Sequence, residues 1–247
     1  MISILQAFPS SELLSGMTLV DTYDLPWPGA SFSVSESADA AHVERSYEAL
    51  SIDLGVTRER IATVHQVHGN RCVEVASVDD CMSVRSEQAD ALMTIQRGIV
   101  LGVKLADCCG VLLYDPVRRA IAAVHSGWRG TAANIAGTTV RAIEQQYGCD
   151  AADVHAWLSP CASGRVYEVG GDVHDALPGY CEPLSEGKWL FDNHRAIVYQ
   201  LVGAGLRPDT ITVNDACTIT DARYHSFRRD RGRSGRMLAF IGMREKP

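Results

Sequence analysis

The sequence lacks the features of a membrane-spanning, secreted or nucleic-acid-binding protein. Its most apolar stretch, 98–114, is interrupted by Lys104 and Asp107 and is too short to span a bilayer. The first twenty residues have neither a cationic start nor an unbroken apolar core, so we expect no signal peptide. A net charge of −7 argues against an extended nucleic-acid surface or an anionic membrane partner. We therefore expect a cytoplasmic protein that binds neither nucleic acid nor membrane.

Two nucleotide-binding motifs and any sign of subdivision are also missing. The chain contains neither G-x-G-x-x-G nor G-x-x-x-x-G-K-[ST], so the sequence supports neither a Rossmann nor a P-loop site. No repeat, low-complexity tract or linker interrupts the 247 residues, of which 46% are hydrophobic. That length and composition suit one large domain with an ample core. We predict a single domain spanning residues 1–247.

Eight cysteines are present, but they do not form the pattern of a disulfide framework. They are scattered through a mid-sized chain in which we expect no secretion signal. We expect reduced thiols, some of them buried and one available as a metal ligand.

Short β-rich runs and a few longer helical periodicities alternate along the chain. Helices are predicted over 40–54, over 131–147 up to Gly148, and from about Asp192 onward. The predicted strands are 61–67, 71–76, 89–95, 99–106, 110–115, 120–125, 154–159, 210–215 and 236–243, with a hairpin turn at 115–119. Strands in such close succession favour an α+β fold with mixed β-sheets packed between helices over a doubly wound parallel sheet.

Three polar residues stand where apolar strands end, namely His68, Cys108 and His125. A catalytic zinc site commonly uses three nitrogen or sulfur ligands and leaves a fourth position for water. Ligands this far apart show no local signature, and each residue taken singly fits a packed core residue better than a metal ligand. Because side chains alternate along a strand, at most one of Cys108 and Cys109 should reach a shared site. Asp107 could orient a ligand histidine or simply open a turn.

The segment "HSGWRGT" (125–131) combines a candidate ligand with a candidate anion site. Gly127 and Gly130 allow a tight turn before the 131–147 helix, whose free N–H groups and Arg129 would face a bound anion. Alternatively, Trp128 fills the core and the glycines only turn the chain. The basic run 228–236 in an otherwise acidic chain also fits a small anion better than a polyanion.

Six segments, taken together and in order, resemble the YfiH/PgeF family of laccase-domain proteins. They are "HQVHG" (65–69), "ADALMT" (89–94), "ADCCGVLLYDP" (106–116), "AAVHSGWRGT" (122–131), "VYEVG" (166–170) and "ACT…FRRD…SGRMLAFI" (216–241). The resemblance implies a YfiH-like fold, related to a group of cysteine-hydrolase-like proteins. It also implies a zinc site, with copper as the other candidate, held by His68, Cys108 and His125. It thereby selects Cys108 over Cys109.

The activity implied by the resemblance is phosphorolysis of adenosine, inosine and methylthioadenosine, with adenosine deamination beside it. The implied partners are a small purine nucleoside and phosphate. Guanidinium groups match phosphate in two-pronged fashion, and the candidates are Arg129, Arg228, Arg229 and Arg236. Candidates for stacking on a purine are Tyr167, Trp128 and Phe227. A proton-shuttling carboxylate could come from Glu168 or Asp215, although both fit surface positions better.

The sequence also departs from the family pattern, and other functions stay open. The region 28–43 lacks the family's glycine-rich polar signature, 158–170 replaces its usual glycines, and Cys109 stands where an apolar residue is common. A Cys-His or zinc amide hydrolase acting on a cell-wall precursor is the main alternative. A non-enzymatic module with a structural zinc is disfavoured, because structural sites normally have four protein ligands. Polyphenol oxidase activity is also disfavoured, since none of the eight histidines forms an H-x-H pair.

Overall fold

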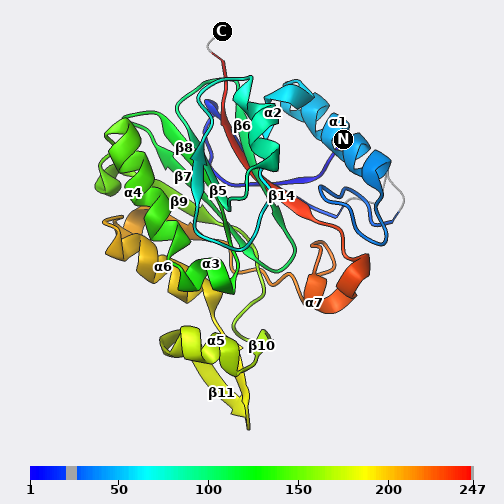
Figure 1. The fold of residues 1–247 in the computed structure, drawn as a ribbon, viewed down its shortest axis with the longest axis vertical. Coiled ribbons are helices and arrows are strands. Elements are labelled where there is room, and N and C mark those ends of the chain that lie inside the picture. The colour runs from blue at the N-terminus through cyan, green and yellow to red at the C-terminus, as the bar shows by residue number, and fades with distance from the viewer. Residues whose placement is uncertain (21–26, 246–247) are drawn as a thin grey trace.

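The computed structural model describes residues 1–20 and 27–245 and arranges them as two central β-sheets with helices on their outer faces (Figure 1). The first sheet has the strand order β1-β2-β14-β6-β3. Its strands are β1 (Ile4–Gln6), β2 (Leu13–Thr18), β3 (Ile61–Ala62), β6 (Val100–Leu105) and β14 (Met237–Met243). Only the pairing of β3 with β6 is parallel, so the sheet is mixed.

The second sheet carries most of the residues that matter for the site, in the order β13-β9-β7-β8-β5-β4. Its strands are β4 (Cys72–Glu74), β5 (Ala91–Thr94), β7 (Cys109–Asp115), β8 (Ala120–Ser126), β9 (His155–Leu158) and β13 (Ile211–Val213). The two outermost pairs are parallel and the inner ones antiparallel. The predicted turn joins β7 to β8, and Asp115 Oδ1 accepts the N–H groups of Val117 and Arg118 there.

Strand alternation divides the apolar side chains between a core inside the two sheets and cores under the helices. Along β8, Ile121 and Ala123 point between the sheets, whereas Ala122 and Val124 point to the helical side. Residues of the first sheet, such as Leu101, pack against the same core between the two sheets. Each buried side chain of this size stabilises the fold by about 1.5–3 kcal/mol, so both faces of the second sheet are committed to packing.

Helices cover both outer faces. Helix α1 (Ala40–Leu54) packs on the first sheet, while α4 (Ile135–Tyr147) and α6 (Asn193–Gly203) cover the second. The Asp39 side chain caps α1 by accepting the His42 N–H, and Asp192 caps α6 through the Arg195 N–H. The remaining helices are short: α2 (Asp80–Ser83), α3 (Trp128–Ala132), α5 (Gly171–Ala176) and α7 (Phe227–Asp230).

A third, three-stranded sheet lies with α5 at one end of the molecule (Figure 1). It has the order β10-β12-β11 and consists of β10 (Glu168–Val169), β11 (Cys181–Ser185) and β12 (Lys188–Phe191). Val169, Val173, Leu177 and Phe191 give it a small apolar core of its own. The sequence analysis did not predict these strands, nor β1 and β2.

The predicted fold class is confirmed, and so is the helix over 40–54, whose Val43, Tyr47 and Leu50 are buried. Two element predictions were wrong. The strand expected at 61–67 spans only Ile61–Ala62, because the chain continues from there as the loop that contains His68. The helix expected at 131–147 is two helices, α3 and α4, separated at Asn134, whose φ of 57° is incompatible with a continuous helix. No helix in the described ranges has the length and apolarity needed to cross a membrane.

Candidate active site

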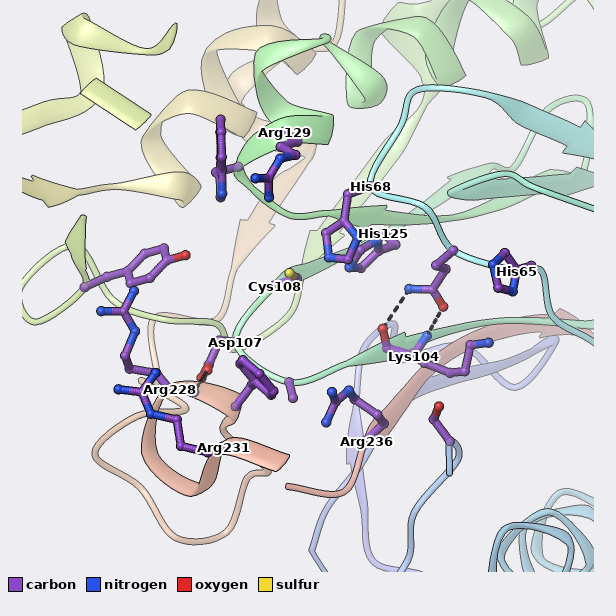
Figure 2. Close-up of a pocket in the computed structure, with 16 residues that line it drawn as sticks. His65, His68, Lys104, Asp107, Cys108, His125, Arg129, Arg228, Arg231 and Arg236 are labelled. Carbon is purple, nitrogen blue, oxygen red and sulfur yellow. Dashed lines mark hydrogen bonds between the residues drawn. The ribbon is translucent and has the colours of Figure 1, made fainter. Parts of the chain in front are cut away.

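His68, Cys108 and His125 lie together, although they come from three separate parts of the chain (Figure 2). His68 is in the loop after β3, Cys108 directly precedes β7, and His125 is in β8. One ligand atom from each lies within 4.8 Å of the others, and the two imidazole rings meet edge to face with centroids 4.8 Å apart. We call these three residues the cavity cluster.

The register of β7 and β8 brings Cys108, rather than Cys109, to the histidines. The two strands are antiparallel, with Gly110 opposite His125 and Cys109 opposite Ser126. Cys109 points to the helical side of the sheet and is completely buried there. Cys108 has the opposite orientation and packs at the edge of the core between the sheets.

Gly127 is required at its position because the chain passes very close to the cluster. A Cβ atom at this residue would lie 2.8 Å from Cys108 Sγ and 3.2 Å from His68 Cδ2. Any side chain there would push the thiol or the imidazole out of place. Part of the glycine signal in "HSGWRGT" is therefore explained by close approach to the cluster.

Asp90, a fully buried carboxylate just before β5, organises both histidines. Its Oδ1 accepts a hydrogen bond from His125 Nδ1 at 2.8 Å, which leaves Nε2 of that ring for the cluster. The two oxygens of the Asp90 carboxylate also accept hydrogen bonds from the backbone N–H groups of Val67, His68 and Gly69 at 2.7–3.2 Å. These bonds hold the loop in which His68 has a φ of 61°. One carboxylate thus fixes a ring and a loop, as outer-shell carboxylates do in metal sites.

The cluster favours a thiolate and an imidazolium. Burial alone would raise the pKa of the Cys108 thiol, but the adjacent His125 and His68 outweigh it and lower this pKa to about 6. Burial alone would lower the pKa of His125, but Cys108 and Asp90 raise it to about 9. Burial also opposes ionisation of Asp90, yet the hydrogen bonds from His125 and the N–H groups lower its pKa overall. A deprotonated thiol is the form that binds metals.

The cluster forms part of the wall of a cavity of about 570 Å³, a size typical of small-molecule sites. Figure 2 shows several cationic side chains around the same space. The cationic lining residues are Lys104, Arg129, Arg228, Arg231 and Arg236. Among the described residues that line the cavity, Asp107 is the only one with a carboxylate. Although the protein is acidic overall, this cavity is suited to an anionic ligand.

Aromatic rings support three of these arginines. The Arg129 guanidinium lies 4.2 Å from the Trp128 ring centroid, and that of Arg228 lies 5.0 Å from the Tyr167 ring. Arg236 lies 5.5 Å from the Phe227 ring and donates to the carbonyl oxygens of Ser234 and Gly235. Stacking restricts a guanidinium without consuming its donors, so Arg129 and Arg228 can still hydrogen-bond a ligand.

The structure does not bring Arg229 into the cavity. Its guanidinium donates to the Thr218 and Tyr224 carbonyl oxygens and to the Asp230 carboxylate, and it is absent from the lining residues. These contacts give it a structural role, in contrast to its neighbour Arg228. Within the segment 228–236, the arginines that line the cavity are Arg228, Arg231 and Arg236, whereas Arg229 stabilises the loop.

Asp107 does not orient a ligand histidine, which corrects one possibility considered from the sequence. Its two oxygens accept hydrogen bonds from Thr218 Oγ1 at 2.7 Å and from the Arg228 backbone N–H at 2.6 Å. It thus fixes the segment that carries Arg228. Of the two other carboxylates, Glu168 pairs with Lys188 at 2.8 Å and Asp215 lines a different cavity. Neither lines the cavity next to the cluster.

The expected anion site at the start of a long helix also needs correction. Arg129 lies in α3, which has only five residues and begins after Gly127, not in a helix continuous to Tyr147. Arg129 itself does line the cavity. Any anion binding here therefore depends on side chains more than on a long helix dipole.

Sequence reasoning missed Asp90, Gln66, Lys104 and Arg231. The Gln66 side chain makes two hydrogen bonds with the Lys104 backbone, at 2.8 and 2.9 Å, and joins the His68 loop to β6. Lys104 donates its ammonium to the Val64 carbonyl oxygen, and burial lowers its pKa. Two features of the sequence could have pointed to them. Lys104 is a charged residue inside the apolar run 98–114, and Asp90 directly precedes an apolar strand.

The donor chemistry of the cavity cluster fits a single zinc or copper ion. Two imidazoles and one thiolate make a three-ligand set of the kind that leaves a further position free in catalytic zinc sites. A cluster of several copper ions would require more imidazoles, and of the eight histidines only His68 and His125 converge here. His65 also lines the cavity but does not belong to the cluster.

Comparison with known proteins gives consistent matches along most of the chain. A purine nucleoside phosphorylase of Deinococcus radiodurans is 31% identical over 224 residues, covering 88% of this chain and 83% of the relative. One from Xylella fastidiosa is 38% identical over 195 residues, covering 72% and 71%. The crystal structure of YlmD from Geobacillus stearothermophilus matches with a TM-score of 0.89 and 28% identity, covering 95% of this chain and 93% of that one.

A second solved structure, the hypothetical protein YfiH of Bacillus licheniformis, matches with a TM-score of 0.88 and 26% identity, covering 94% and 93%. The family described as multi-copper polyphenol oxidoreductase laccase matches residues 23–244. This chain therefore belongs to that laccase-domain family, the YfiH/PgeF family that its motifs predicted.

Proposed function

We propose that this protein is a zinc-dependent purine nucleoside phosphorylase whose catalytic and metal-binding residues are His68, Cys108 and His125. The observation that carries the proposal is the meeting, in one cavity of about 570 Å³, of this cluster with arginines suited to phosphate. Similarity to proteins named purine nucleoside phosphorylase supports the same activity class. The description of the family as multi-copper oxidases receives less support, because the donor set suits one ion.

Phosphorolysis requires a phosphate oxygen to attack C1′ of the ribose while the bond from C1′ to the purine nitrogen breaks. The products are ribose 1-phosphate and the free base, which takes up a proton. Arg129 and Arg228 are proposed to bind the phosphate, since each lines the cavity and a guanidinium carries five N–H donors. Lys104, Arg231 and Arg236 add positive charge around the same space. Binding two reactants side by side supplies much of the rate enhancement in such a displacement.

Aromatic residues at the cavity wall offer surfaces for the purine. Tyr167, Trp128 and Phe227 all line it. Burial raises the pKa of Tyr167 to about 12, so its hydroxyl stays protonated and can donate a hydrogen bond at neutral pH. A zinc ion bound to the cluster would supply Lewis-acid stabilisation of charge that develops on the substrate.

The proposed substrates are adenosine, inosine and methylthioadenosine, with adenosine deamination as a side activity. Deamination needs a group that shuttles a proton to the leaving amine. The carboxylate found among the described lining residues, Asp107, is already engaged by Thr218 and by the Arg228 N–H. We therefore expect deamination to be much slower than phosphorolysis.

The test is an assay of purified, zinc-loaded protein with each nucleoside, with and without phosphate. Release of base and ribose 1-phosphate that depends on phosphate is the expected result. Release of free ribose at the same rate without phosphate would instead identify a hydrolase. No base release from any of the three nucleosides, with metal occupancy verified, would contradict the proposal.

A Cys-His amide hydrolase is the second candidate, and one observation favours it. Cys108, His125 and Asp90 are arranged as a nucleophile, base and orienting carboxylate, and the Cys108 pKa is lowered to about 6. The substrate would be an amide such as a cell-wall precursor. Turnover of such amides by metal-free protein would support this function. Nucleoside phosphorolysis that strictly requires zinc would argue for the phosphorylase.

A further inference from the structure

A second group of sulfur and nitrogen donors lies on the other side of the sheet from the cavity, and the proposed function does not use it. Cys109 begins β7, Cys161 follows β9, and His194 is in the first turn of α6. One ligand atom from each lies within 4.8 Å of the others. In the described part of the chain, this trio and the cavity cluster are the only groups of this kind. We call the trio the buried cluster.

The spacing of the buried cluster fits a tetrahedral metal ion. Zinc bonds of 2.3 Å to sulfur and 2.0–2.1 Å to nitrogen imply a sulfur-to-nitrogen separation of roughly 3.6 Å. The distance from Cys161 Sγ to His194 Nε2 is 3.3 Å. The carbonyl oxygen of Ser159 also points here, 2.8 Å from His194 Nε2 and 3.7 Å from Cys109 Sγ. Small shifts would therefore give two sulfurs, one nitrogen and one oxygen around a central ion.

These donors are held rigidly and shielded from water. Cys109 and Cys161 are both 0% exposed and lie in the apolar core between the second sheet and α4 and α6. The Ser159 backbone is fixed to β7, since its N–H donates to the Gly110 carbonyl and its hydroxyl accepts the Gly110 N–H. A divalent ion with two thiolates carries no net charge, which removes much of the cost of burying it.

The histidine side of the buried cluster borders open space. His194 lines a separate cavity of about 490 Å³, together with the carboxylates Asp192, Asp215 and Glu182 and the arginines Arg165 and Arg195. Cys161 Sγ lies 3.3 Å from His194 Nε2, and the two thiols also donate to carbonyl oxygens at 3.5–3.7 Å. Two buried thiols beside an imidazole are suited to a thiophilic ion, of which zinc is the common tetrahedral one.

We propose that Cys109, Cys161 and His194 bind one Zn²⁺ ion, with the Ser159 carbonyl as fourth donor, at a site distinct from the cavity cluster. The ion ties together β7, the segment after β9 and helix α6. Because these elements are far apart in sequence, the bound ion stabilises the folded protein and raises its Tm. The site is closed by protein donors, so it has a structural role and not a catalytic one.

The test is the zinc stoichiometry of full-length protein, stripped with a chelator under reducing conditions and then titrated with Zn²⁺. We expect two ions per chain in the wild type and in Cys81→Ala, a control that removes another buried thiol. We expect one ion in Cys161→Ala, in His194→Gln and in Cys108→Ala. The glutamine variant tests the site even if Cys161→Ala fails to fold. With Co²⁺, the ion retained by Cys108→Ala should show about twice the sulfur-to-cobalt absorption of the ion retained by His194→Gln.

Three results would overturn the proposal. One is a stoichiometry of one zinc in the wild type, with that ion lost in Cys108→Ala and kept in His194→Gln. Another is two ions in His194→Gln, which would place the second ion elsewhere. The third is recovery of Cys109 and Cys161 as a disulfide that no reducing agent opens to metal, which would make the pair a cross-link. None of these results depends on nucleoside turnover, so the phosphorylase proposal stands or fails separately.

Discussion

Cys108 and Cys109 are neighbours in the chain, but each belongs to a different cluster on opposite faces of the second sheet. Both clusters combine cysteine sulfur with histidine nitrogen at similar spacing. The cavity cluster opens into a space lined by five lysine and arginine side chains, whereas both thiols of the buried cluster are enclosed by apolar residues. The donor types are thus alike, and the surroundings separate the site proposed for chemistry from the site proposed for stability.

The second difference concerns how the histidines are oriented. His125 donates to the buried carboxylate of Asp90, which also holds the His68 loop. His194 Nε2 lies 2.8 Å from the Ser159 carbonyl oxygen and 3.3 Å from the Cys161 thiol, and in the described part of the chain no carboxylate hydrogen-bonds to its ring. A carboxylate behind a ligand histidine increases its basicity and fixes its ring. The two clusters thus differ in the residue behind the ligand histidine, as well as in the number of thiols.

The largest effect expected is the loss of activity in Cys108→Ala. Removing the single thiolate of the cavity cluster removes the proposed Lewis-acid centre, so phosphorolysis should fall on the order of 10³-fold. The measurement is kcat/KM for inosine with metal occupancy determined on the same samples. Cys81→Ala is the control and should retain wild-type activity, because Cys81 is a buried residue of α2 and does not line the cavity. Undiminished phosphorolysis in Cys108→Ala would remove the basis for assigning chemistry to this cluster.

Thiol reactivity should separate the two clusters next. In metal-loaded protein, Cys108 should react slowly with an alkylating reagent, because its sulfur lone pairs are engaged. After chelation, Cys108 should react fast, while Cys109 and Cys161 should stay slow because both are 0% exposed. Mapping the modified cysteines by mass spectrometry gives all three rates at once. Fast modification of Cys108 in loaded protein would favour the hydrolase nucleophile instead.

Asp90→Asn should weaken metal binding at the cavity cluster by about 10–100-fold, the usual effect of losing an outer-shell carboxylate. The amide keeps the shape of the side chain but cannot accept from His125 and the three loop N–H groups together. Zinc affinity, measured by competition with a chromophoric chelator, checks this. Asp115→Asn is the matched control, since Asp115 is equally buried but serves the β7–β8 turn. If both variants bind zinc like the wild type, the carboxylate is not what distinguishes the clusters.

The sequence predicted parts of the molecule that depend on local chemistry. The helix at 40–54 followed from apolar spacing, and the β7–β8 turn followed from proline and aspartate. The left-handed Asn134 that breaks the predicted helix has only a weak local signal, namely that asparagine adopts a positive φ more readily than most residues. The role of Asp90 could not be deduced either, since its partners lie 21–35 residues away. The three cavity ligands came from family motifs and not from spacing.

The smallest effect expected is in Arg129→Lys, which tests whether phosphate binding belongs to the open cluster. Lysine keeps the positive charge but loses the planar, two-pronged donor set, and its ammonium would not stack on Trp128 in the same way. The KM for phosphate should rise about tenfold, the lower end of the effect of losing one charge-assisted hydrogen bond. Zinc content and kcat at saturating phosphate should stay close to wild type.

The matched control for this variant is Arg229→Lys, from the same basic run as Arg228 but outside the cavity. Arg229 donates to the Thr218 and Tyr224 carbonyl oxygens, so its replacement should lower Tm without changing the KM for phosphate. A rise in KM shared by both variants would mean that the loop geometry controls phosphate binding. An unchanged KM in Arg129→Lys, together with a lower Tm, would show that Arg129 and Trp128 form a packed corner. In that case the anion site would have to be built by Arg228, Arg231 and Arg236, on the opposite wall of the cavity from α3 (Figure 2).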